Sequence, residues 1–107
     1  MSADVPLYDL RMHDGSRHFG SFPERGLADP DWHLLRAAIP ELAGAVETGF
    51  VTDQVTEVWL DFTFAGHAFS LNNQHGEWWC FVRDPAAPDV ALRAVLSHFA
   101  ASLGSQR

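Results

Sequence analysis

The chain has 107 residues, of which 47% are hydrophobic, and its formal net charge at pH 7 is −7. This length fits one domain, because two halves would be too small to fold without disulfides or metal. The seven basic residues are all arginines scattered among fourteen acids, which excludes the clustered basic surface that nucleic-acid binding needs.

Cys80 is the only cysteine of the chain, so no disulfide can form within it. A single thiol favours a reducing compartment. The amino end has neither a basic nor an apolar leader segment, and no later stretch is apolar for the length of a membrane span. We therefore expect a cytoplasmic protein with no membrane segment.

The first 28 residues allow two interpretations. Tyr8, Leu10 and Met12 alternate with polar residues, and Asp14-Gly15 suits the tight turn of a hairpin. Such a hairpin places Phe19 opposite Leu10 on the same face. The alternative is that residues 1–28 form a loosely held segment.

Residues 29–39 have the pattern of a helix. Asp29 can cap free backbone N–H groups, and Pro30 fits the first helical position. Trp32 and Ile39 then lie on one apolar face. Pro40 should end or kink this helix, because proline has no N–H to donate.

From residue 46 the apolar period changes to two, which predicts strands near 46–52, 55–64, 67–73 and 77–83. A two-residue turn at Ala65-Gly66 would join the second and third of these strands. Every pair of large residues then lands on one face, which a slip of one residue would invert. These pairs are Phe64 with His67, Phe62 with Phe69, and Leu60 with Leu71.

The last element is a helix that begins near Pro88 and ends at Gly104. Its apolar positions form a stripe wide enough to lie on a sheet; they are Leu92, Val95, Leu96, Phe99 and Leu103. We predict an α+β fold: an antiparallel four-stranded meander with two helices packed on one face, as a two-layer sandwich. One domain spans 1–107, with helix, meander and C-terminal helix over 29–104 and an extra N-terminal hairpin as an option.

Two registers are open for the last hairpin. If residues 74–76 form a three-residue loop, Trp79 joins the core and Trp78 lies beside Trp59 on the second face of the sheet. If residues 75–76 form a two-residue turn, Trp78 faces the core and Trp79 moves outward. Either register leaves one tryptophan besides Trp59 on the face that the helices do not cover.

Polar residues collect at the corner of this hairpin. Asn72, Asn73 and His75 bring many donors and acceptors to one place, and such groups can orient a small polar ligand or a peptide. They are also typical turn residues, which explains the run without a ligand. Candidate ligand-binding or partner-binding residues are therefore Trp59, His67, Asn72, Asn73, His75, Glu77 and Trp78.

We predict neither a catalytic nor a metal site, and no cofactor. His67 and His75 are the central members of the only His, Cys and carboxylate cluster, and they lie at opposite ends of one predicted strand. Cys80 falls between aromatic residues in mid-strand, where burial makes a thiol inert. His13 and His18, beside the first turn, are expected to lie in solvent.

A run of short motifs extends along the predicted meander. These motifs read Asp61-Phe62-Thr63-Phe64, Gly66-His67, Phe69-Ser70, Asn72-Asn73-Gln74, Gly76-Glu77, Phe81-Val82 and Asp84-Pro85. With these motifs, the segment from about 46 to 100 resembles a small family of bacterial domains with no established function. The resemblance implies a bacterial cytosolic domain and assigns no functional residue.

Three functions fit these features. The first is a non-catalytic module that binds a protein partner or a second copy of itself through the uncovered face, using Trp59 and its tryptophan neighbour. The second is a small-molecule or catalytic pocket at the 72–77 corner. The third, an immunity-type protein that neutralises a toxin, rests only on the size and acidity of the fold.

Overall fold

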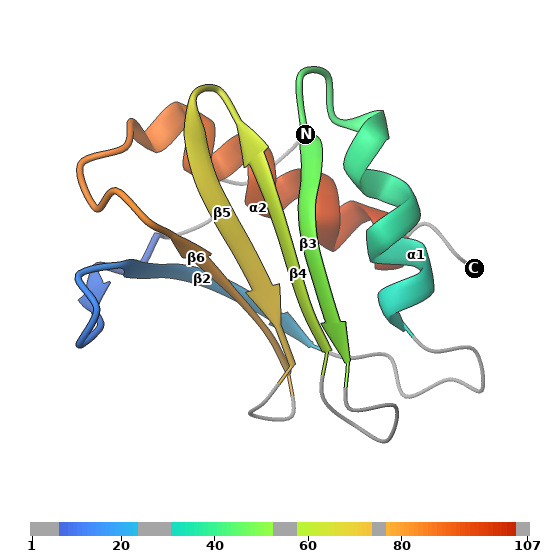
Figure 1. Cartoon of the computed structure of the whole chain (residues 1–107), viewed down its shortest axis with the longest axis horizontal. Coiled ribbons are helices and arrows are strands. Elements are labelled where there is room, and N and C mark those ends of the chain that lie inside the picture. Colours follow the sequence, from blue (N-terminus) through green and yellow to red (C-terminus); the bar gives the residue numbers. More distant parts are fainter. Residues whose placement is uncertain (1–6, 24–30, 53–57, 74–76, 105–107) are drawn as a thin grey trace.

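In the computed structural model, the described residues are 7–23, 31–52, 58–73 and 77–104. They form an α+β fold in which one antiparallel sheet carries two helices (Figure 1). The sheet order is β1-β2-β6-β5-β4-β3. Its strands are β1 Leu10–Arg11, β2 Arg17–Pro23, β3 Val46–Thr52, β4 Val58–Phe64, β5 His67–Asn72 and β6 Glu77–Val82. The helices are α1 Asp31–Ala38, a 3-10 turn η1 Ile39–Glu41, and α2 Asp89–Gly104.

The predicted meander is present as β3 to β6, but the predicted number of four strands is wrong. The N-terminal hairpin pairs through β2 with β6 and extends the sheet to six strands. This pairing joins segments some sixty residues apart in sequence, so no local sequence pattern predicts it. In Figure 1, β2 runs at a steep angle to β3 because the sheet is strongly twisted.

The register of the β4–β5 hairpin agrees with the prediction. Phe64 pairs with His67, Phe62 with Phe69, and Leu60 with Leu71. Ala65 and Gly66 both have positive φ, 54° and 80°, as both central residues of a type I′ turn do. The large side chains of these strands therefore face the helices.

The register between β5 and β6 is that of the two-residue turn. Leu71 pairs with Cys80 and Asn72 with Trp79. Trp78 is consequently buried in the core, with 1% of its surface exposed. The interpretation that put Trp78 on the second face is wrong, and Trp79 lies there instead.

Both helices pack on the same side of the sheet. The predicted stripe of α2 is buried. Leu35 and Ala38 of α1 join the same core, and Pro40 coincides with the change from α-helix to the 3-10 turn η1. The start proposed for α1 at Asp29 lies outside the described residues.

The predicted pairing of Phe19 with Leu10 is wrong. Leu10 pairs with His18, and its side chain is 54% exposed. A β-bulge between His18 and Gly20 inserts Phe19 as an extra residue of β2. The bulge sends Phe19 into the core, where its ring meets Phe69 edge-on.

Candidate functional site

The face of the sheet opposite the helices carries two neighbouring cross-strand rows of side chains. We refer to it as the open face. Paired residues of adjacent strands point to the same side of a sheet. The first row is Gly49, Asp61, Ser70, Phe81 and His18, and the second is Val51, Trp59, Asn72, Trp79 and Ser21. The two rows place a carboxylate and three short polar side chains among four aromatic rings.

A hollow of about 490 Å³ lies on this face, within the ~300–1,000 Å³ range of ligand sites. Its lining includes Trp59, Asp61, Ser70, Asn72 and Phe81 from the two rows. The N-terminal hairpin contributes to its rim, and so does the residue after β6; these rim residues are Met12, Asp14, Ser16 and Arg83. We name this space the open-face hollow.

Asp61 is a carboxylate of β4 that lines the open-face hollow. Ser70 on β5 donates its hydroxyl to Asp61 Oδ1 at 2.7 Å. On the other side, a methyl group at Gly49 would lie 3.1 Å from Asp61 Oδ2, so glycine at this position avoids a close contact with that oxygen. Over the described ranges of the chain, no arginine or histidine nitrogen lies within 4.0 Å of this carboxylate.

The aromatic residues of the open face differ in how tightly they are held. Trp79 stacks on His18 with ring centroids 4.2 Å apart, and Tyr8 packs edge-on against His18. The expectation that His18 lies in solvent is therefore wrong, since only 3% of its surface is exposed. Trp59 and Phe81 are half-buried and line the hollow. The N-terminal hairpin thus covers one end of the face and leaves the Trp59 end uncovered.

The rim of the hollow holds a second carboxylate. The hydroxyl and the backbone N–H of Ser16 both donate to Asp14 Oδ1, at 2.7 and 2.9 Å. These hydrogen bonds, with a smaller contribution from the charge of Arg83, hold the pKa of Asp14 below its ordinary value. Asp14 is therefore ionised at neutral pH, and the hollow carries two carboxylates against one guanidinium.

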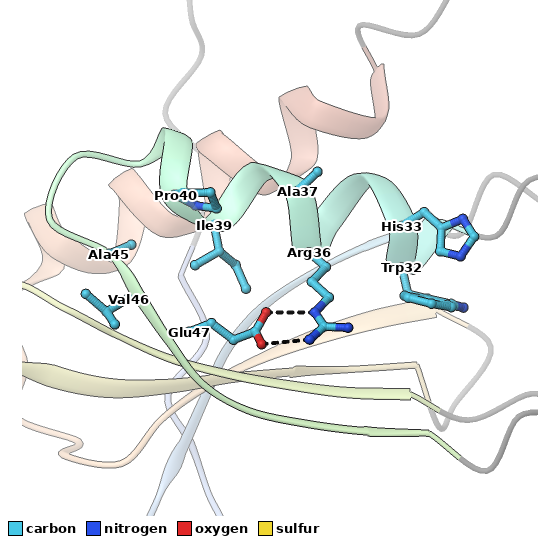
Figure 2. Close-up of a pocket in the computed structure, with 9 residues that line it drawn as sticks. All are labelled: Trp32, His33, Arg36, Ala37, Ile39, Pro40, Ala45, Val46 and Glu47. Atoms are coloured by element: carbon cyan, nitrogen blue, oxygen red, sulfur yellow. Dashed lines mark hydrogen bonds and ion pairs between the residues drawn. The ribbon is translucent and has the colours of Figure 1, made fainter.

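A second hollow, of about 660 Å³, within the same ligand-site range, lies between α1 and the edge strand β3 (Figure 2). Figure 2 shows the Arg36 side chain pointing from α1 toward Glu47 of β3. The guanidinium donates to both carboxylate oxygens, at 2.8 and 2.9 Å, and lies 4.1 Å from the centroid of the Phe50 ring. Hydrogen bonds and charge within this pair lower the pKa of Glu47 and raise that of Arg36. Within this hollow, the charges of Arg36 and Glu47 therefore neutralise each other.

The residues predicted for the 72–77 corner do not converge. His67 pairs with Phe64 at the far end of β5, about 16 Å from Asn72 at ~3.3 Å per residue. Asn73 Oδ1 accepts a hydrogen bond from the Val58 N–H at 2.8 Å. Glu77 Oε1 accepts one from Trp79 Nε1 at 3.1 Å. His75 lies outside the described residues.

Of the predicted site residues, Trp59 and Asn72 line the open-face hollow. Asn72 sits between Trp59 and Trp79 in the second row and is 6% exposed. The candidate residues drawn from the sequence did not include Asp61, Ser70, Phe81 or Trp79, although the two-residue turn had placed Trp79 on this face. The predicted β4–β5 register already paired Asp61 with Ser70, so that register was the signal that pointed to this pair.

In the part of the chain that the structure describes, there is neither a metal-binding cluster nor a reactive thiol. No three His, Cys, Asp or Glu side chains there are grouped to hold a metal ion. Cys80 is fully buried, and loss of solvation raises the pKa of its thiol far above the ordinary value. Neither described helix is long and apolar enough to cross a membrane.

No protein-family model, curated protein or solved structure matches this chain.

Proposed function

We propose that this chain is a non-catalytic protein-binding module that takes its partner on the open face of the sheet. One observation carries the proposal: Trp59 and Phe81 are half-buried at a hollow on the face opposite both helices. Large rings that keep exposed area on a rigid sheet gain contact area on binding at little entropic cost.

The composition of the open face favours a protein over a small metabolite. Large aromatic rings are enriched at the centre of protein interfaces, and tryptophan carries much of the binding energy there. A catalytic pocket needs titratable groups in mutual contact, whereas His67, Asn73 and Glu77 point to separate partners. The surface supplies contact area and two carboxylates, which suits recognition rather than chemistry.

The charge of the chain favours a different protein over a second copy. At a net charge of −7, two copies repel each other at long range, whereas a basic partner is attracted. A symmetric dimer through the open face would also bring two copies of the same carboxylates together. The partner we propose is therefore a protein with a basic binding surface.

Site-specific photo-crosslinking in the native cells tests this proposal. A benzophenone amino acid replaces Ala68, an exposed alanine that lines the open-face hollow, or Ala101, an exposed alanine on α2 that serves as the matched control. We expect a discrete adduct to one other protein from position 68 and none from position 101. The captured protein, once purified, should bind the wild-type chain and bind Trp59→Ala at least tenfold more weakly in calorimetry.

Three outcomes contradict the proposal. An adduct of twice the chain mass from position 68 shows self-association instead of a heterologous partner. Equal labelling from both positions shows that the open face has no special role. A captured protein that binds Trp59→Ala as tightly as wild type shows that its contact lies elsewhere.

A further inference from the structure

Asp61 and Asp14, the two acids that line the open-face hollow, differ in the positive charge near their carboxylates. Asp14 is hydrogen-bonded to Ser16, and the positive charge of Arg83 acts on Asp14. Asp61 has only the neutral hydroxyl of Ser70. A half-buried carboxylate with a single neutral donor gains more from a cation than a fully hydrated one, because less water screens the pair.

The neighbours of Asp61 fit a cation with a flat apolar surface. Trp59 is two residues before Asp61 on β4, so both side chains point into the hollow from the same face. Phe81 pairs with Ser70, on the other side of the Asp61–Ser70 hydrogen bond. The faces of indole and phenyl rings attract cations. The hollow therefore holds a carboxylate together with an indole ring from the same strand and a phenyl ring from two strands away.

We propose that the open-face hollow binds an arginine side chain of the partner protein, with the guanidinium at Asp61 Oδ2 and its plane against the Trp59 ring. This inference rests on the proposed function and names the chemistry that recognises the partner. Arginine is favoured over lysine because its planar guanidinium is weakly hydrated, donates along its edge and stacks on aromatic rings. Gly49 fits this contact, because it has no side chain to crowd Asp61 Oδ2.

The test uses the ¹⁵N-labelled full chain and N-acetyl-arginine methylamide as the probe, followed by two-dimensional NMR. A single side chain should bind with a Kd of about 1–10 mM, near the weak end of the affinity scale. We expect saturable shifts of the Trp59 indole N–H signal and of the Asp61 and Ser70 amides. N-acetyl-citrulline methylamide, the neutral isostere, should produce shifts too small to saturate, and the lysine analogue should bind at least threefold more weakly.

Two variants and one matched control identify the site. Asp61→Asn should weaken arginine binding at least tenfold, since the amide keeps the shape but not the charge. Gly49→Ala, whose methyl group would crowd Asp61 Oδ2 while the carboxylate stays charged, should weaken binding at least threefold. Glu41→Gln removes the same charge from the exposed 3-10 turn behind the sheet and should change the Kd by less than twofold.

The outcomes separate this inference from the proposed function. Equal affinity for arginine and citrulline probes, equal affinity of Asp61→Asn and wild type, or the absence of saturation in the wild type would each overturn the arginine assignment. If position 68 still yields the specific adduct in that case, the open face binds a partner without arginine. If position 68 yields no adduct, the proposed function fails independently of the probe.

Discussion

The two sides of the sheet each carry a tryptophan and an acidic residue, but these residues differ in burial and in their partners. On the covered side, Trp78 is enclosed by the core, and Glu47 at its margin is held by two hydrogen bonds from Arg36. On the open side, the adjacent Trp79 keeps part of its surface exposed, and Asp61 has a hydroxyl as its only described partner. The side chains on the covered side have their packing and hydrogen-bond partners within the chain. Trp79 and Asp61 on the open side keep surface or hydrogen-bonding capacity that another molecule can use.

The adjacent tryptophans give the largest expected contrast. Trp78→Ala should lower the free energy of unfolding by about 3–5 kcal/mol, because it removes a large side chain from a closed core. Trp79→Ala should cost about 1–2 kcal/mol, since the ring is only partly buried and loses mainly its stack on His18. Urea denaturation followed by circular dichroism measures both values. Equal losses would show that the two sides contribute alike to folding.

One glycine on each side of the sheet allows the same comparison, with a smaller expected effect on stability. A methyl group at Gly20 would lie 2.6 Å from Leu96 Cδ2, where α2 approaches β2. Gly20→Ala should therefore destabilise the fold by about 1–3 kcal/mol through overpacking. Gly49→Ala on the open side should cost less than about 1 kcal/mol, because the Asp61 side chain can turn toward solvent. Thermal unfolding of the pair checks the order, and a larger loss at Gly49 would reverse our assignment of the faces.

The Arg36–Glu47 pair predicts a small effect that depends on pH. The pKa of Glu47 is lowered in the folded chain from its ordinary value of 4.5. The pair therefore stabilises the fold fully above that ordinary value, and this stabilisation is lost as the pH falls through the lowered folded pKa. Glu47→Gln should reduce Tm at pH 7 by about 4 °C or less, as for other solvent-accessible pairs.

The same variant tests the direction of the pH effect. The difference in Tm between wild type and Glu47→Gln should shrink toward zero as the pH falls from 6 to below the lowered pKa. Glu41→Gln, on the exposed 3-10 turn, should show no such trend. A difference that grows on acidification would mean that the Arg36–Glu47 pair does not stabilise the ionised form.

Local patterns predicted the parts of the fold that depend on neighbouring residues. The order of the four meander strands, the β4–β5 register and the buried stripe of α2 all follow from alternation and helical spacing, because one slip would expose every large side chain. The β5–β6 register could not be chosen in this way. Residues 78–82 are all apolar, so both registers bury large residues equally well, and only the assembled sheet separates them.

The N-terminal hairpin and the candidate site show where sequence reasoning ends. Pairing of β2 with β6 is non-local, and it brings His18 against the Trp79 ring, which no local pattern could show. In the alternating pattern of β4, Asp61 occupies the position of an ordinary solvent-facing residue. Its significance appears only when Gly49, Ser70 and Phe81 stand beside it in one row.

The central claim is that Asp61 is present for a partner and not for folding, and the stability of Asp61→Asn tests it most directly. Asparagine can still accept the Ser70 hydrogen bond, and no internal ion pair of Asp61 is described for the substitution to break. We predict a free energy of unfolding within about 0.5 kcal/mol of wild type, as for substitutions outside the core and its networks. A loss of about 2 kcal/mol or more, measured by urea denaturation at pH 7, would show that the carboxylate serves the fold and would contradict this account.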